Sequence, residues 1–281
     1  MIVTMEQKQN ETQFQLPNWI NKNEYPFQSK RVNINGKKTH YIDEGEGQVI
    51  LFAHPACTWS FIYRDLIKVL SVRYRCIAPD FPGFGFSQFD ETYEFSIKGQ
   101  SFFLEAFINH LQLSQILFLG HDTGGPSGFL LAAKKPSLFK GFILTDTIIY
   151  PTNEYKKLHR FLGVLGTWPM RWINRQFNLV VWAMLNNLKA HKVDSEIKRQ
   201  YFNTFKTKEE RDRVWKLLLS LRNSEDLMNE IKVAFQSTLI DKPSLLIYGD
   251  SDPVQEMGVP ERILNTVHNS ELHLIKNEGH F

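Results

Sequence analysis

Five short apolar runs, separated by segments of helical pattern, constrain the fold of this 281-residue chain more than any other feature. Short apolar runs bounded by turn residues are typical of strands buried on both faces, and strands that alternate with helices form mainly parallel sheets. We therefore predict an α/β fold in which helices cover both faces of a mainly parallel sheet. The expected strands are 49–53, 74–78, 116–119, 142–145 and 245–248, and the expected helices are 61–69, 96–111, 128–135 and 260–267.

Residues 31–43 alternate between polar and apolar side chains around the dipeptide Asn35-Gly36. Asn-Gly tolerates the positive φ angles of a tight two-residue turn, so this alternation predicts a β-hairpin. We expect the hairpin to form an antiparallel edge of the sheet. Residues 1–24 precede it and are expected to form a polar N-terminal leader.

The rhythm of strands stops between residues 151 and 238, where the pattern is helical and Lys and Arg outnumber Asp and Glu. We predict that this stretch is a helical cap inserted into a core made of residues 25–150 and 239–281. The cap can pack its aromatic rings in a core of its own or turn some of them toward a substrate cavity, and both interpretations stay open. It holds four of the six tryptophans, Trp168, Trp172, Trp182 and Trp215.

Composition excludes several classes of function. The formal net charge is only +3, and no motif that interleaves basic and aromatic residues suggests nucleic-acid binding. The two cysteines, Cys57 and Cys76, are too few for a disulfide framework. No apolar stretch approaches the ~18 residues that span a membrane, and the N-terminus lacks the pattern of a signal peptide. We therefore expect a cytoplasmic protein without a membrane or nucleic-acid partner.

The stretch Gly120-His121-Asp122-Thr123-Gly124 joins an expected strand to an expected helix. It has the outline of a nucleophile elbow, the sharp turn that exposes the attacking side chain of many hydrolases, but it holds Asp where that outline normally holds Ser. The two glycines allow a turn that a Cβ would crowd, and the N-terminus of the following helix favours an ionised carboxylate. Asp122 is therefore the candidate nucleophile.

Polar residues follow several of the expected strands, at the edge where parallel sheets carry their functional loops. Asp252 follows the strand at 245–248, and His280 lies close to the end of the sequence. The order Asp122, Asp252, His280 matches the nucleophile–acid–histidine order of α/β-hydrolase triads. Asp146, after the strand at 142–145, is the alternative acid.

These residue types suit a two-step displacement at an alkyl carbon. The Asp122 carboxylate attacks the carbon, expels a leaving group and forms an aspartyl ester, which water then hydrolyses with His280 as the base and Asp252 as its orienting acid. We expect the oxyanion of hydrolysis to be bound by the backbone N–H groups of Thr123 and of Ala56 in the 54–57 loop.

Four segments resemble the α/β-hydrolase superfamily in the branch of haloalkane dehalogenases and epoxide hydrolases. These are HYIDEGEG, TWSFIYRDLI, YRCIAPDFPGFGFS and GHDTGG. The resemblance runs from about Tyr25 to the last residue. It implies an Asp–His–acid triad, a helical cap, a small apolar substrate that reacts with water, and neither a metal nor an organic cofactor.

Two positions depart from the dehalogenase pattern. Thr123 stands where dehalogenases typically carry a Trp that holds the halide, and Ala56 stands where an Asn often supplies a second donor. The Thr123 hydroxyl and a cap indole, Trp168 or Trp172, are the candidate replacements. Epoxide hydrolysis is the alternative activity, with Tyr155 and Tyr201 as candidate proton donors to the opening oxygen. A non-catalytic ligand-binding member of the fold is a second alternative.

Overall fold

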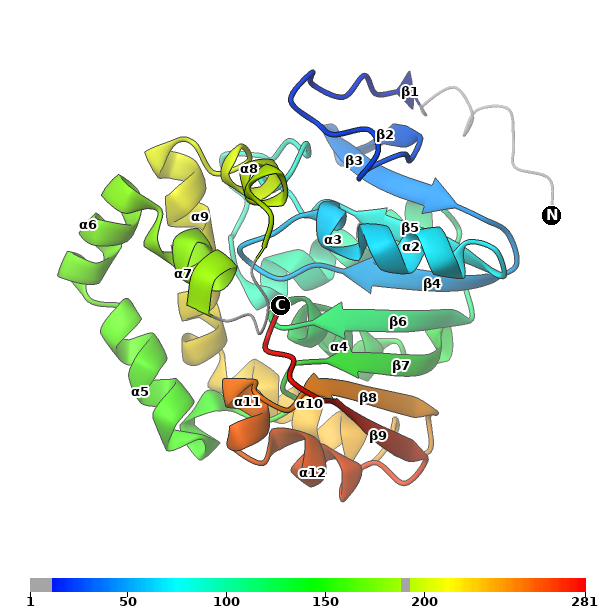
Figure 1. Cartoon of the computed structure of the whole chain (residues 1–281). Helices are drawn as coiled ribbons and strands as arrows, with labels where there is room; N and C mark the ends of the chain where they lie inside the picture. The colour runs from blue at the N-terminus through cyan, green and yellow to red at the C-terminus, as the bar shows by residue number, and fades with distance from the viewer. Residues whose placement is uncertain (1–11, 188–192) are drawn as a thin grey trace.

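The computed structural model describes residues 12–187 and 193–281, and its strands form one sheet in the order β1-β2-β3-β5-β4-β6-β7-β8-β9 (Figure 1). The neighbours from β5 across to β9 pair in parallel, whereas β1, β2 and β3 pair antiparallel. The predicted α/β fold and all five expected strands are confirmed. The strands are β1 (Thr12–Gln13), β2 (Ser29–Ile34), β3 (Lys37–Glu44), β4 (Gln48–Ala53), β5 (Tyr74–Pro79), β6 (Ile116–His121), β7 (Phe139–Thr145), β8 (Ser244–Gly249) and β9 (Ser270–Ile275).

The predicted hairpin is β2 and β3, and it forms the antiparallel edge as expected. Asn35 and Gly36 have φ angles of +50° and +81° between the two strands, as a tight turn of this kind requires. The segment predicted as a polar leader packs on the rest of the protein in its described residues, because β1 pairs with β2 and Ile20 is buried. Trp19 accepts a hydrogen bond at its carbonyl from the Gln200 side chain, 3.2 Å away, so the leader contacts the helical insertion.

Helices cover both faces of the sheet, and α3, α4 and α10 pack side by side. The ring of Phe235 in α10 packs against Phe129 in α4 and Phe142 in β7, with both centroid distances 5.3 Å. The helices are α2 (Arg64–Leu70), α3 (Ile97–His110), α4 (Gly124–Lys134), α5 (Lys156–Leu165), α6 (Trp168–Phe177), α7 (Leu179–Asn187), α8 (Ser195–Phe202), α9 (Lys208–Asn223), α10 (Glu225–Phe235), α11 (Pro253–Glu256) and α12 (Val259–Leu264). No helix among the described residues is long and apolar enough to cross a membrane.

In the segment predicted as a cap, the described residues form helices joined by short turns, from the 3₁₀ turn at Thr152–Glu154 to α10, and contain no strand. Helices α5 to α9 gather beside the carboxyl ends of the parallel strands, and the C-terminus of the chain lies between them and the sheet (Figure 1). Helix α10 differs, because it packs on α4 against the sheet. The division into core and cap therefore remains a prediction, with α10 on the core side of the packing.

The carboxyl ends of the central strands are in register. Gly120 of β6 pairs with Ala53 of β4, and His121 pairs with Thr145 of β7. Thr145 in turn pairs with Ile247 of β8. The loops that follow these strands consequently start at one edge of the sheet, beside helices α5 to α9 (Figure 1).

Candidate active site

Asp122 lies at the tip of a sharp turn between β6 and α4, with a φ angle of +46° that residues with side chains rarely adopt. A Cβ at Gly124 would lie 2.1 Å from the carbonyl oxygen of Ala53, and one at Gly120 would lie 2.5 Å from the Cα of Gly125. Both glycines are therefore required by the close approach of the helix to the sheet. The turn has the shape expected of a nucleophile elbow.

Helix α4 begins at Gly124, earlier than the expected helix at 128–135. The sequence Gly124-Gly125-Pro126 discourages a helix on propensity alone, but Pro126 falls in the first turn, where a backbone N–H has no partner within the helix anyway. The early start brings the helix N-terminus, with its partial positive charge, directly behind Asp122. Tertiary contacts thus outweigh local propensity at this point of the chain.

His280 lies between Asp122 and Asp252. Its Nδ1 is 2.9 Å from Oδ2 of Asp252, a hydrogen bond, and its Nε2 is 3.8 Å from Oδ1 of Asp122, an ion pair. Asp252 is fully buried, and its other oxygen accepts a hydrogen bond from the Val254 N–H at 2.7 Å. The Asp122 carboxylate keeps 20% of its surface exposed, so a substrate can reach it. The three residues named from the sequence are brought together.

The electrostatics of this group are strongly coupled. Burial disfavours the charged form of His280, but the carboxylates of Asp122 and Asp252 outweigh burial and hold the pKa of His280 well above its usual value. Burial also disfavours ionised Asp252, whereas the hydrogen bond and charge of His280 lower the pKa of Asp252 to about 2. At neutral pH the site therefore holds an imidazolium next to two carboxyl groups.

Asp146, the alternative acid, lies beside this group but does not hold the histidine. Single side-chain atoms of Asp146, Asp252 and His280 all lie within 4.8 Å of one another. The Gly249 N–H donates to Asp146 at 3.1 Å. Burial, and then the hydrogen bond and charge of Asp252, raise the pKa of Asp146 to about 9. Asp146 is therefore a neutral carboxyl group at pH 7, next to an ionised one.

The two backbone donors expected for the oxyanion differ in the structure. Among the described residues, none accepts a hydrogen bond from the Thr123 N–H, which is the free donor that an oxyanion needs. The Ala56 N–H instead donates to Oγ1 of Thr123 at 2.8 Å. The buried Thr123 hydroxyl therefore occupies the Ala56 N–H in this structure, and a role of Ala56 in binding the oxyanion stays a prediction.

The four residues suggested for a substrate pocket do not form one wall. Trp168 and Trp172 lie on α6 with 75% and 48% of their surfaces exposed, as surface side chains. Tyr201 is buried and packs edge-on against Phe61 at 5.4 Å, and burial raises its pKa to about 12. Tyr155 lies elsewhere, with its ring 6.4 Å from that of Tyr150. Hydrophobicity and helical pattern alone gave no information on which way these rings face.

His121 is a neighbour of the site to which the sequence analysis assigned no role. Its ring centroid is 5.3 Å from that of His280, and its Nδ1 lies 3.0 Å from the carbonyl oxygen of Thr145. Burial and the positive charge of His280 lower the pKa of His121 to about 4, so the ring is neutral. The only signal in the sequence was its position next to Asp122.

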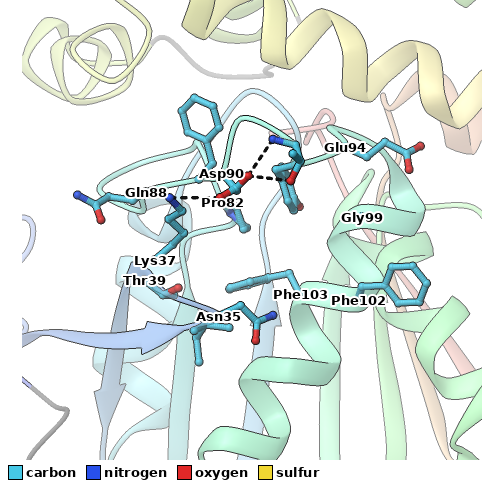
Figure 2. Close-up of a pocket in the computed structure, with 14 residues that line it drawn as sticks. Asn35, Lys37, Thr39, Pro82, Gln88, Asp90, Glu94, Gly99, Phe102 and Phe103 are labelled. Atoms are coloured by element: carbon cyan, nitrogen blue, oxygen red, sulfur yellow. Dashed lines mark hydrogen bonds and ion pairs between the residues drawn. The ribbon is translucent and has the colours of Figure 1, made fainter.

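A surface pocket of about 490 Å³ lies away from this site (Figure 2). Figure 2 shows it between the β2–β3 hairpin, the 82–94 loop and α3, where Lys37 and Asp90 form an ion pair of 3.2 Å. Asp122, Asp252 and His280 are not among the described residues that line it. This pocket is therefore separate from the candidate active site.

A parallel sheet with an acidic nucleophile elbow and a histidine–carboxylate pair at its carboxyl edge defines an α/β-hydrolase. The alpha/beta hydrolase fold family model matches residues 48–281, and the chain belongs to this family. Within it, a curated relative that is 30% identical over 81% of this chain places the protein in the haloalkane dehalogenase branch, as a haloalkane dehalogenase-like hydrolase.

Two curated relatives and one solved structure support this placement. The chain is 30% identical over 228 residues to haloalkane dehalogenase 2 of Mycobacterium tuberculosis, covering 81% of this chain and 79% of the relative. It is 26% identical over 262 residues to a haloalkane dehalogenase of Psychrobacter cryohalolentis, covering 87% and 82%. The crystal structure of haloalkane dehalogenase DbeA from Bradyrhizobium elkani shares the fold, with a TM-score of 0.81, 20% identity and coverage of 90% and 91%. These relatives do not favour the epoxide hydrolase or binding-protein alternatives.

Proposed function

We propose that the protein hydrolyses small apolar haloalkanes through an ester on Asp122. The observation that carries this proposal is the position of His280, whose Nε2 lies 3.8 Å from the Asp122 carboxylate while its Nδ1 is held by buried Asp252 at 2.9 Å. A carboxylate that is reachable, backed by a helix N-terminus and faced by a histidine can both attack carbon and be released again by water.

In the first step, Oδ of Asp122 attacks the carbon that carries the halogen. The new C–O bond forms as the C–X bond breaks, and the halide leaves with the bonding electron pair. The positive charge of His280 beside the nucleophile does not prevent this step, because Asp122 needs no proton removed before it attacks. The product is an alkyl ester of Asp122 and a free halide ion.

In the second step, water attacks the carbonyl carbon of that ester and gives its proton to Nε2 of His280. Ester formation removes the negative charge of Asp122, which is one of the two carboxylates that raise the pKa of His280. The pKa of His280 therefore falls once the ester has formed, so the imidazolium releases its Nε2 proton to solvent and the neutral ring can accept the proton of the attacking water. The Thr123 N–H stabilises the oxyanion, and collapse of the intermediate releases the alcohol with the proton returned by His280.

The Thr123 hydroxyl is the proposed donor to the departing halide. Its oxygen accepts a hydrogen bond from the Ala56 N–H, so its own proton is left to be donated to an anion beside Asp122. Thr123 is fully buried, where a hydrogen bond to an ion is worth more than in water. The pair Ala56–Thr123 would thus take over the work of the two missing side-chain donors.

A second candidate substrate class is the strained lactone. The chain is 33% identical over 157 residues to a cis-3-alkyl-4-alkyloxetan-2-one decarboxylase of Shewanella oneidensis, covering 53% of this chain and 49% of that relative. An oxetan-2-one needs no halide donor, which fits the departures at Thr123 and Ala56. Carbon dioxide release from such a lactone is the measurement that distinguishes this activity from dehalogenation.

Intact mass spectrometry of the His280→Ala protein after incubation with 1-bromohexane tests the proposal. Without the base the ester cannot be hydrolysed, so a hexyl group should accumulate on the protein, and peptide mapping should place it on Asp122. The double variant Asp122→Asn/His280→Ala is the matched control and should gain no mass.

An adduct on another residue, or the same adduct in the double variant, would contradict a nucleophilic role of Asp122. A folded His280→Ala protein that gains no mass from any of several bromo- and iodoalkanes would contradict the haloalkane substrate. Carbon dioxide release by the unmodified protein from an oxetan-2-one would then select the second candidate.

A further inference from the structure

Helices α5, α6 and α7 expose large apolar side chains of kinds that proteins often bury. Trp168 is 75% exposed, Phe177 68% and Phe161 62%. We call this surface the aromatic face; it consists of Phe161, Val164, Trp168, Trp172, Phe177 and Trp182 on α5, α6 and α7.

Two pairs of residues in the aromatic face are spaced so that each pair lies on one side of its helix. Phe161 and Val164 are three positions apart on α5, and Trp168 and Trp172 are four apart on α6, spacings that place side chains on one helix face. The rings of Trp172 and Phe177 are in contact, with centroids 6.3 Å apart. Figure 1 shows α5 and α6 at the outer margin of the molecule, away from the sheet. The exposed side chains of α5 and α6 therefore lie on the outside of the molecule.

The same helices are purely basic. Residues 156–187 contain no Asp or Glu, and their basic residues are Lys156, Lys157, Arg160, Arg171 and Arg175. Arg171 and Arg175 form ion pairs with Asp212 of α9. The exposed cations Lys156, Lys157 and Arg160 on α5 form no ion pair with any described residue. Their charge is available to an outside partner.

We propose that the aromatic face docks the protein on a bilayer surface that contains anionic lipids. Exposed tryptophans and phenylalanines that are interleaved with basic residues fit the interface between headgroups and acyl chains, where an amphipathic surface lies in the plane of the membrane without crossing it. Anionic headgroups attract the unpaired cations of α5, at about fivefold in binding per charge. This contact revises the expectation of no membrane partner, which rested on the absence of a spanning segment.

The charge beside the aromatic face favours an anionic membrane over a second copy of the chain as its partner. A symmetric interface between two aromatic faces would bring the basic α5 helices of both copies together, and like charges oppose such an interface. An anionic membrane complements the same charges. The proposal does not depend on the proposed reaction, because the surface lies outside the catalytic residues.

Sedimentation of the full chain with vesicles tests the proposal. Vesicles of pure phosphatidylcholine are compared with vesicles that also contain phosphatidylglycerol. We expect binding to the anionic vesicles that weakens as salt is raised, because exposed charges are screened. Trp168→Ser/Trp172→Ser should weaken binding about tenfold or more through loss of apolar contact. Val69→Ser/Val72→Ser, two exposed valines near the end of α2, is the matched control and should bind like the unchanged protein.

Charge reversal supplies a second, independent pair of variants. Lys157→Glu/Arg160→Glu should abolish the preference for anionic vesicles, whereas Lys22→Glu/Lys276→Glu, with the same change in net charge, should retain it. No binding to anionic vesicles, or equal binding by all four variants, would overturn the proposal. A dimer in analytical ultracentrifugation that the tryptophan substitutions dissociate would assign the face to a second copy instead.

Discussion

Side chains at the carboxyl edge of the sheet are buried and hydrogen-bonded, whereas large apolar side chains on helix α6 are exposed. At the sheet edge, Asp252 is fully buried and His280 nearly so, and each has a defined hydrogen-bond partner. On the cap, Trp168 and Trp172 are largely exposed. At the sheet edge the backbone holds the candidate catalytic side chains in defined positions, whereas helix α6 exposes its tryptophans to solvent. A sequence motif at the end of a buried strand therefore predicts where a functional side chain lies. A helix rich in aromatic residues does not predict whether its rings are buried or exposed.

The substitution Asp122→Asn tests most directly whether the reaction takes place at the carboxyl edge of the sheet. If the chemistry rests on the sheet edge, this substitution should reduce halide release at least ~10³-fold, because the amide is a poor nucleophile. Its stability should change little, since the side chain is partly exposed and similar in shape. Steady-state halide release and urea denaturation measure the two effects. Activity within tenfold of the unchanged protein would place the nucleophile elsewhere.

Asp252→Asn distinguishes the two candidate acids. Loss of the carboxylate at Nδ1 lowers the pKa of His280 and removes the group that orients its ring, so we expect about a 10²-fold loss of turnover. Titration of the His280 ring by NMR in the free protein should show the lowered pKa. If Asp146 were the acid that holds the histidine, Asp252→Asn would leave both quantities nearly unchanged.

Particular residues show how far the sequence reached. The five strands, the hairpin at Asn35-Gly36 and the grouping of Asp122, Asp252 and His280 were predictable, because each depends on local pattern or on strand order. The sequence did not settle whether Asp252 or Asp146 is the partner of His280. Both residues follow neighbouring strands, and only their distances to the His280 ring in the structure distinguish them. The early start of α4 and the packing of α10 on α4 were missed because tertiary contacts decide them.

The bond from the Ala56 N–H to the Thr123 hydroxyl was also beyond the sequence, because it joins residues 67 positions apart. It yields a prediction for the leaving group. Thr123→Val keeps the shape of the side chain but removes the hydroxyl, and should slow ester formation tens-fold. Thr123→Ser keeps the hydroxyl and should lie within a few fold of the unchanged protein. Burst kinetics of halide release measure the step, and equal rates in the two variants would exclude the hydroxyl as the donor.

We predict that Asp146 lowers the free energy of unfolding at neutral and alkaline pH. Its pKa is raised from 3.8 to about 9 in the folded protein, so the native state must keep a proton that the unfolded chain releases above about pH 4. Its contribution to stability is present below pH 4 and is lost progressively as pH rises toward 9. Asp146→Asn, which carries no such proton, should therefore gain stability relative to the unchanged protein as the pH rises from 4 to 8, by up to about 1.4 kcal/mol per pH unit. At pH 4 the two proteins should be similar.

Urea denaturation at pH 4, 6 and 8 measures this difference. Asn also tolerates the φ of +45° at this position, so backbone strain does not confuse the comparison. A difference that stays constant across the three pH values would mean that Asp146 is not the protonated member of the pair. Asp65→Asn is a suitable control, because it makes the same chemical change at an exposed side chain of α2.

The smallest predicted effect compares a packed tryptophan, Trp215, with an exposed one, Trp168. Trp215 of α9 donates a hydrogen bond from its indole N–H to the Leu165 carbonyl at 2.9 Å and stacks beneath the guanidinium of Arg171 at 4.8 Å. Trp215→Phe should lower the free energy of unfolding by about 1 kcal/mol through loss of that bond. Trp168→Phe should change it by less than about 0.5 kcal/mol, since an exposed ring loses little. Equal losses in urea denaturation would mean that Trp168 packs within the cap, and the distinction between a structural interior and a presented surface would fail.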